Sequence, residues 1–132
     1  MESERPALQK RRVLVVDDNV VLTTTLKRLL ESRGYEASIF SDGADALKHM
    51  LHQNVDAVIC DLEMPQLEGD TLYTTIERIE PRLASRFIFV TGLASDPKYR
   101  ALFERMGCPV FEKPVEKRDL LQALERLLAQ NF

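Results

Sequence analysis

A short apolar run at residues 55–60 ends directly at an acidic residue, Asp61, and only Asp56 interrupts the run. Four to eight apolar residues with β-branched members are typical of a central parallel strand that is covered on both faces. Pro65 cannot donate a hydrogen bond to a neighbouring strand, so the strand has ended by that residue. Because sites in open α/β sheets lie at the carboxyl ends of the strands, we expect Asp61 at the floor of a site.

Strands and helices alternate along the rest of the chain. Apolar runs predict further strands at residues 13–16, 36–40, 87–90 and 110–111. Helical periodicity predicts helices between residues 19 and 34, after residue 43, at 69–79, between 97 and 107, and from about 116 to 130. Five strand–helix units with short loops predict an α/β fold, in which a five-stranded parallel sheet carries helices on both faces.

Apolar side chains recur at helical spacing in each predicted helix, and we expect them to face the sheet. They are Leu22, Leu26, Leu29 and Leu30, then Ala46, Leu47, Met50 and Leu51, then Leu72, Ile76 and Ile79, then Ala101, Leu102 and Met106, and finally Leu120, Leu121, Leu124, Leu127 and Leu128.

Length and charge favour one domain of ordinary globular type. We expect residues 1–11 to form a flexible tail and residues 12–132 to form a single folded domain, since 132 residues suit one domain. A net charge of −3 gives no general attraction to nucleic acid. The sequence has no apolar stretch of membrane-spanning length and no signal core at its start, so we expect a cytoplasmic protein without membrane contact.

Polar side chains follow four of the predicted strands. Asp17 and Asp18 follow the first strand, Asp61 the third, Thr91 the fourth and Lys113 the fifth. Converging carboxylates are unfavourable without a cation, and few oxygen ligands with open positions suit Mg²⁺. A carboxylate can also attack phosphorus to give an aspartyl-phosphate, a reaction that needs positioning and charge neutralisation. These residues therefore predict a magnesium-dependent phosphoryl-accepting site.

At these residues the chain resembles the response-regulator receiver domain of two-component signalling. The matching elements are Asp17-Asp18, the segment from Asp61 to Pro65, Thr91-Gly92 and Lys113-Pro114, in family order on four strand ends. The resemblance covers nearly the whole chain and implies a flavodoxin-like sheet with strand order 2-1-3-4-5. It also implies a phosphorelay protein that catalyses only its own phosphorylation and dephosphorylation and signals by a phosphorylation-biased conformational change.

The resemblance assigns a role to each matching residue. Asp61 is the expected phospho-acceptor. Asp18, Asp61 and the backbone carbonyl of Glu63 are expected to ligate Mg²⁺ directly, and Asp17 through a bound water. Lys113 is expected to contact the phosphoryl group and to precede a cis peptide bond, and Thr91 to turn inward on phosphorylation.

The chain departs from the family pattern near the fifth strand. Receivers often carry a rotating aromatic residue three positions before the lysine, where this chain has Val110. Phe111 follows it and should point to the other side of the strand. Leu93 places an apolar side chain near the mouth of the site.

Two surfaces are candidates for protein partners. Val20, Val21 and Thr24 lie off the apolar stripe of the first helix, where a histidine kinase or a histidine phosphotransfer protein could dock. The fourth helix, fifth strand and fifth helix could form a dimer or effector face. The residues of that second face are Tyr99, Arg100, Phe103, Arg118, Gln122 and Arg126.

Two other functions remain open from the sequence. The chain could be a receiver-fold interaction module that signals without phosphorylation, although the acidic residues and Lys113 argue against that function. It could also be a phosphatase of the aspartyl-phosphate type, because Glu63 lies two residues beyond Asp61, where such enzymes carry a general acid.

Overall fold

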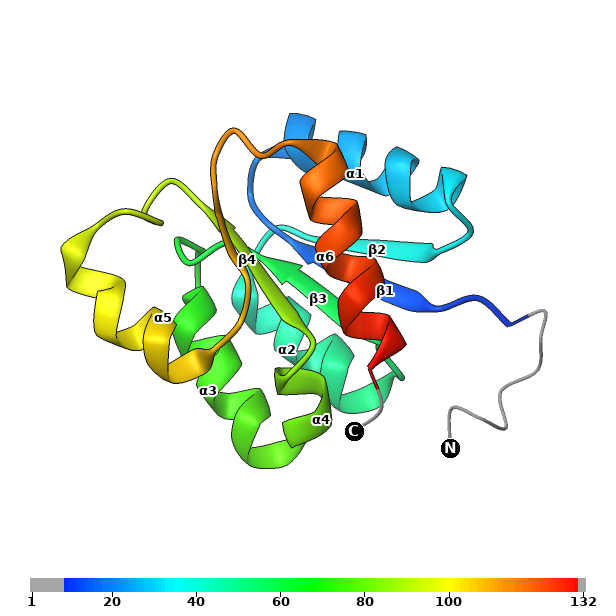
Figure 1. Ribbon diagram of the computed structural model, residues 1–132. Helices are drawn as coiled ribbons and strands as arrows, with labels where there is room; N and C mark the ends of the chain where they lie inside the picture. Colours follow the sequence, from blue (N-terminus) through cyan, green and yellow to red (C-terminus); the bar gives the residue numbers. More distant parts are fainter. Residues whose placement is uncertain (1–8, 131–132) are drawn as a thin grey trace.

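The computed structural model describes residues 9–130, and its centre is a five-stranded parallel sheet (Figure 1). The strands are β1 (Arg12–Val16), β2 (Glu36–Phe40), β3 (Ala57–Cys60), β4 (Phe87–Thr91) and β5 (Val110–Glu112). Their order in the sheet is β2-β1-β3-β4-β5, so the predicted α/β fold and strand order are confirmed.

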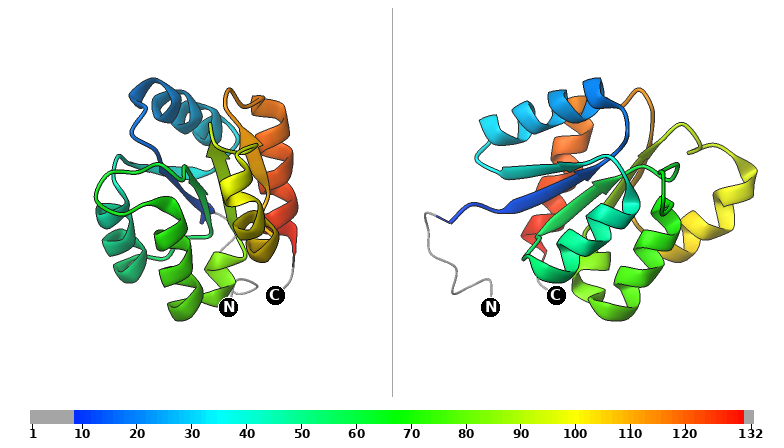
Figure 2. Two further views of the ribbon diagram at one scale, coloured as in Figure 1. Left: turned by 90° about the vertical axis from the view of Figure 1, so that its left-hand side faces the viewer. Right: turned by 180° about the vertical axis from the view of Figure 1, so that it is seen from behind.

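Helices cover both faces of this sheet, as the views from the side and from behind show (Figure 2). The helices are α1 (Val20–Ser32), α2 (Gly43–His52), α3 (Gly69–Ile79), α4 (Pro81–Ala84), the 3₁₀ turn η2 (Pro97–Tyr99), α5 (Arg100–Met106) and α6 (Lys117–Ala129). Helices α1 and α6 pack on one face through leucines, and α2, α3, α4 and α5 pack on the other. Each face therefore has its own apolar core.

Local signals set the ends of several helices. The side chain of Asn19 accepts a hydrogen bond from the Leu22 N–H at the start of α1. Asp42 does the same for Asp45 at the start of α2. Gly107 ends α5 with a φ of 68°, a left-handed conformation that suits glycine.

Asp56, the acidic residue inside the apolar run at residues 55–60, lies just before β3. The strand begins at Ala57, one residue after Asp56, which is only 5% exposed. The Asp56 side chain accepts a hydrogen bond from the Arg12 N–H at 2.7 Å, and the Asp56 N–H donates to the Arg12 carbonyl at 2.8 Å. The buried carboxylate therefore joins the beginnings of β1 and β3.

Some predicted details of the helices are wrong. Leu51 and Ile79 are 48% and 55% exposed because they lie at the ends of α2 and α3, past the part of each helix that the sheet covers. Ala101 is also exposed. Helix α4 was not predicted, and the fourth predicted helix begins as a 3₁₀ turn.

The described part of the predicted N-terminal tail contacts the domain. Residues 1–8 lie outside the described residues, whereas Arg11 donates from Nη1 to the Leu128 carbonyl at 3.4 Å. The boundaries proposed for tail and domain stay a prediction. Within residues 9–130, no helix has both the length and the apolar character needed to cross a membrane.

Candidate functional site

Strands β1 and β3 are neighbours in the middle of the strand order, so their carboxyl ends lie side by side. Val16 pairs with Cys60 in the parallel register, so the residues that follow them, Asp17 and Asp61, leave the sheet together. The Asp61 N–H donates to the Val16 carbonyl at 3.0 Å. Both acids are almost fully buried, with exposures of 4% and 5%. The sequence-based expectation that these carboxylates converge is met by the register.

Lys113 brings the positive charge that two buried carboxylates need. Its Nζ atom lies 2.7 Å from Asp17 Oδ2 and 2.8 Å from Asp61 Oδ2. The lysine follows β5 directly, and the peptide bond between it and Pro114 is cis, as predicted. One ammonium group therefore bridges the ends of β1 and β3 from the end of β5.

The other oxygen of each carboxylate accepts a backbone hydrogen bond. Asp17 Oδ1 accepts from the Asn19 N–H at 2.9 Å, and Asp61 Oδ1 accepts from the Glu63 N–H at 3.3 Å. Burial alone lowers the pKa of Lys113, but the hydrogen bonds and charges of Asp17 and Asp61 more than offset it and raise that pKa above its ordinary value. The ammonium therefore stays charged at neutral pH.

Two predicted metal ligands lie beside the buried pair. They are Asp18, which follows the buried Asp17, and Glu63, which lies two residues after the buried Asp61. The side chains of both are exposed. Within residues 9–130, no three histidine, cysteine, aspartate or glutamate side chains are grouped so as to hold a metal ion. The donors at this edge are nevertheless all oxygens, and two of them already share one cation, so their chemistry fits a hard cation such as Mg²⁺.

Thr91 ends β4 beside the same edge and is fully buried, with 0% exposure. Its hydroxyl oxygen accepts a hydrogen bond from the Leu93 N–H at 3.1 Å. Its carbonyl accepts from the Lys113 N–H at 3.1 Å, which ties it to the chain segment that carries the ammonium. In this conformation the Thr91 hydroxyl is therefore hydrogen-bonded to the loop that follows β4.

The two residues at the start of β5 point to opposite faces, as predicted. Val110 packs against the core cluster under α3 and α5, and Phe111 against the cluster under α1 and α6. The Phe111 ring therefore lies on the opposite face of β5 from Val110, so it does not take the place of an aromatic residue at that position.

Two glycines position the loop that follows Asp61, and sequence reasoning missed this role. A Cβ atom on Gly69 would lie 2.1 Å from the Asp61 carbonyl oxygen, and one on Gly43 would lie 1.8 Å from the Leu67 carbonyl oxygen. Real Cβ atoms do not approach so closely, so both positions require glycine. The sequence signal is weak, because a glycine at a helix start is common for other reasons.

Cys60, immediately before Asp61, is a buried thiol whose Sγ donates to the Asp61 carbonyl at 3.0 Å. Burial, with smaller effects from the charges of Asp61 and Asp17, raises its pKa well above the ordinary value. A protonated, buried thiol is a poor nucleophile, so Cys60 packs and does not react. Cys108 is also a free thiol.

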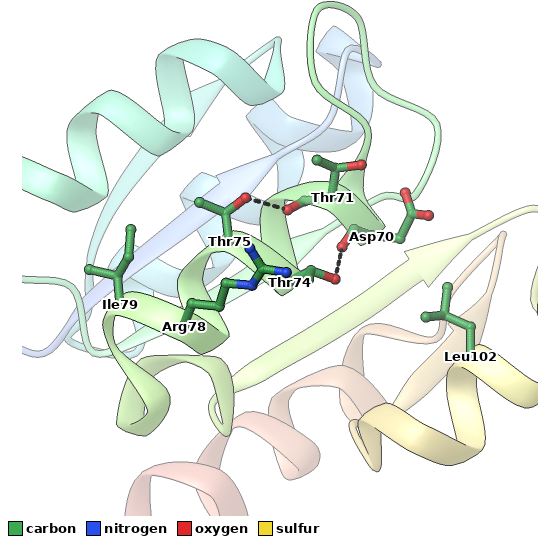
Figure 3. A pocket seen from close by; sticks show the side chains of 7 residues that line it. All are labelled: Asp70, Thr71, Thr74, Thr75, Arg78, Ile79 and Leu102. Atoms are coloured by element: carbon green, nitrogen blue, oxygen red, sulfur yellow. Dashed lines mark hydrogen bonds between the residues drawn. The ribbon is translucent and has the colours of Figure 1, made fainter.

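A separate groove lies along α3 and faces α5 (Figure 3). It has a volume of about 390 Å³ and is lined by Asp70, Thr71, Thr74, Thr75, Arg78, Ile79 and Leu102. The hydroxyls of Thr74 and Thr75 donate to the carbonyls of Asp70 and Thr71 within the helix. The groove contains none of the predicted site residues.

The predicted partner surfaces are exposed to different degrees. Val20 and Val21 are 71% and 77% exposed at the start of α1. Tyr99 and Phe103 are only half-buried and pack against the core, with ring centroids 6.1 Å apart. The apolar patch beside the site is therefore more open than the aromatic residues of the second face.

Comparison with known proteins identifies relatives of this fold and site. The profile of the response regulator receiver domain matches residues 13–125. The CAI-1 autoinducer sensor kinase/phosphatase CqsS of Vibrio cholerae is 39% identical over 114 residues, which are 85% of this chain and 16% of CqsS. The transcriptional regulatory protein GlrR of Escherichia coli is 32% identical over 129 residues, which are 98% of this chain and 28% of GlrR. The chain thus spans less than a third of the length of these relatives.

Solved structures agree. A CheY-like receiver domain protein from Methanospirillum hungatei superposes with a TM-score of 0.83 at 28% identity and covers 91% of this chain and 94% of its own. The response regulator protein TrrA from Thermotoga maritima, solved in complex with Mg(2+)-BeF, superposes with a TM-score of 0.77 at 28% identity. The superposition covers 89% of this chain and 99% of TrrA.

The fold and site define a parallel α/β signalling domain with an acidic pair and a lysine at the carboxyl edge of its sheet. The chain belongs to the response regulator receiver domain family of two-component signalling. Members of this family are signalling phospho-acceptors that pair with histidine kinases, rather than enzymes that turn over an external substrate.

Proposed function

We propose that this chain accepts a phosphoryl group on Asp61 in a Mg²⁺-dependent reaction. The observation that carries the proposal is the bridge from Lys113 Nζ to Asp17 at 2.7 Å and to Asp61 at 2.8 Å. It places a nucleophilic carboxylate beside a fixed positive charge at the carboxyl edge of the sheet, which is the arrangement that phosphoryl transfer needs.

The transfer takes the phosphoryl group from a phosphohistidine on a histidine kinase or a histidine phosphotransfer protein. One Asp61 carboxylate oxygen forms a bond to phosphorus as the phosphorus–nitrogen bond of the donor breaks. The bonding electron pair leaves with the imidazole nitrogen, which takes a proton from water. The Lys113 ammonium moves from the Asp61 carboxylate, which it contacts before transfer, to the new phosphoryl oxygens, and it neutralises their charge.

We propose Asp17, Asp18, Asp61 and the Glu63 carbonyl as the oxygen donors that hold Mg²⁺, with Asp17 acting through a water. Bound Mg²⁺ would neutralise charge on the phosphoryl oxygens during transfer. The homologous TrrA was solved in complex with Mg(2+)-BeF, which supports Mg²⁺ binding by this chain. The Thr91 hydroxyl would donate to a phosphoryl oxygen after transfer and bias the loop after β4 and its surroundings toward a second conformation.

The exposed patch of Val20 and Val21 is our proposed docking surface for the phosphodonor. Both valines lie in the first turn of α1, and only Asn19 separates that helix from Asp17 and Asp18. A partner that covers this patch brings its phosphohistidine to the carboxyl edge of the sheet. A dimer or effector contact through α5, β5 and α6 completes the proposal.

Intact-mass measurement with acetyl phosphate and Mg²⁺ tests this function. The wild-type chain should gain one phosphoryl group, and Asp61→Asn should gain none. Asp119→Asn, an exposed position on α6, is the matched control and should be modified like the wild type. A wild-type chain that stays unmodified, or Asp61→Asn modified as fully as wild type, would refute the proposal. A chain that in addition binds no Mg²⁺ at millimolar concentration would favour the phosphorylation-independent module.

A further inference from the structure

The loop that leaves the site after Thr91 is tied to β5 by a side-chain hydrogen bond. Ser95 donates from Oγ to Glu112 Oε1 at 2.7 Å, a short distance that suits a charged acceptor. Glu112 pairs with Thr91 in the parallel register of β4 and β5. The segment from Thr91 to Ser95 is therefore held by β5 at both of its ends.

The same loop donates a hydrogen bond to the Thr91 hydroxyl oxygen. The Leu93 N–H donates to Thr91 Oγ1 at 3.1 Å, and the Asp96 N–H donates to the Leu93 carbonyl at 3.0 Å. Leu93 is half-buried and packs against the core cluster under α3 and α5. Residues 93–96 thus form one compact turn, so a displacement of Ser95 also displaces the N–H that engages the hydroxyl.

Glu112 lies next to Lys113 in the chain. Because side chains alternate along a strand, Glu112 projects to the same face of β5 as Val110. This is the face on which the β4–α5 loop sits, and Val110 is too small to reach across it as an aromatic ring could. Two consecutive residues therefore contact the two parts of the site: Glu112 holds the loop, and Lys113 holds the carboxylates.

We infer that Ser95 and Glu112 are positioning residues for Thr91. Their hydrogen bond holds residues 93–96 in the turn that keeps the Thr91 hydroxyl engaged with the Leu93 N–H. The acceptor bond from the Leu93 N–H leaves the hydroxyl proton free but holds Oγ1 toward the loop. An inward turn of Oγ1 toward a phosphoryl group on Asp61 gives up this bond, and the accompanying shift of the turn breaks the Ser95–Glu112 bond. The pair therefore stabilises the unphosphorylated conformation. This role rests on the function proposed above.

The expected size of the effect follows from the type of bond. A hydrogen bond from a hydroxyl to a carboxylate is stronger than one between neutral groups, but both side chains here are exposed, which weakens it. Removal of the bond should shift the conformational equilibrium by about three- to tenfold. The shift should appear as tighter binding of a phosphoryl analogue.

Titration with beryllium fluoride in saturating Mg²⁺ tests the role on the whole chain. Ser95→Ala and Glu112→Ala should each lower the half-saturating concentration about three- to tenfold. The double variant should gain no more than either single variant, because both remove the same bond. Ser95→Thr, which keeps a hydroxyl, should stay near wild type. Damage to the fold would weaken binding, so the direction of the change separates positioning from a structural role.

Ser32→Ala and Glu104→Ala are matched controls, since both side chains are exposed and lie on α1 and α5 outside this loop, and neither should change the half-saturating concentration. Single variants that bind like wild type or more weakly would overturn the role of the pair, and so would a double variant that gains the product of both effects. A wild-type chain that neither binds beryllium fluoride nor takes a phosphoryl group from acetyl phosphate would instead overturn the proposed function, and this role with it.

Discussion

Removal of the lysine that bridges the two buried carboxylates should destabilise the fold markedly. In Lys113→Met the apolar stem is kept, but Asp17 and Asp61 are left as buried like charges without their cation. Loss of one partner from a buried ion pair costs about 3–5 kcal/mol. The Lys113 side chain is 25% exposed, so solvent screens part of that cost. We therefore expect a loss of about 2–3 kcal/mol in the free energy of unfolding.

Urea denaturation followed by far-UV circular dichroism measures this loss, since the chain has no tryptophan to report on the core. The titration is run at pH 7 with a chelator, so that no divalent cation replaces the lysine. For a domain of this size, the same change lowers Tm by roughly 3–5 °C per kcal/mol. Lys48→Met, an exposed position on α2, is the matched control and should stay within about 0.5 kcal/mol of wild type.

The pH dependence of the free energy of unfolding provides a second, independent test of the bridge. The pKa of Lys113 is raised in the folded state, so its contribution is fully present below pH 10.5 and is lost as the pH rises through the folded-state value. The difference between wild type and Lys113→Met should therefore shrink in strongly alkaline solution. A variant within 0.5 kcal/mol of wild type at pH 7 would show that the bridge adds nothing to stability and would refute the reasoning.

Two further predictions concern the loop after Asp61 and the core. Gly69→Ala should lower the free energy of unfolding by about 1–3 kcal/mol and slow phosphorylation by acetyl phosphate, because its Cβ would collide with the Asp61 carbonyl. Gly34→Ala, strained by a φ of +89° but with no atom within 4 Å of the new Cβ, should cost about 1 kcal/mol and leave the phosphorylation rate unchanged. Burial, with a smaller effect from Cys108, raises the pKa of Tyr73 to about 12, so the wild type should lose stability as the pH rises from 10 to 12. Tyr73→Phe should lose less over that range in the same urea assay, and an identical loss would contradict this cause.

Much of the sheet could be predicted because local sequence patterns determine its strands. The runs that end at Asp17, Asp61 and Thr91 are apolar and β-branched, and each is followed by a polar residue where the strand leaves the core. Parallel register then brings those polar residues to one edge without any further information. This is why the acids and Lys113 could be assigned to one site from the sequence.

The features that escaped prediction depend on contacts between distant segments. The closeness of Gly43 to the Leu67 carbonyl follows from how α2 meets the loop after β3, and no local pattern encodes it. The hydrogen bond from Ser95 to Glu112 is likewise a loop contact across 17 positions. Ile79 was assigned to the core because helical periodicity continues to the last residue of α3, whereas the sheet that covers the helix does not.

The charges at the strand ends support our proposal that the site binds a further cation. Asp17, Asp18 and Asp61 carry three negative charges within two strand ends, and the salt bridges at 2.7 and 2.8 Å supply one ammonium to balance them. Such an excess costs stability, because buried carboxylates repel one another and lose their hydration. The same excess favours a divalent cation, whose binding releases that repulsion. Under the proposed function, the site exchanges stability in the resting state for affinity, and Asp17→Asn should weaken Mg²⁺ binding more than it weakens the fold.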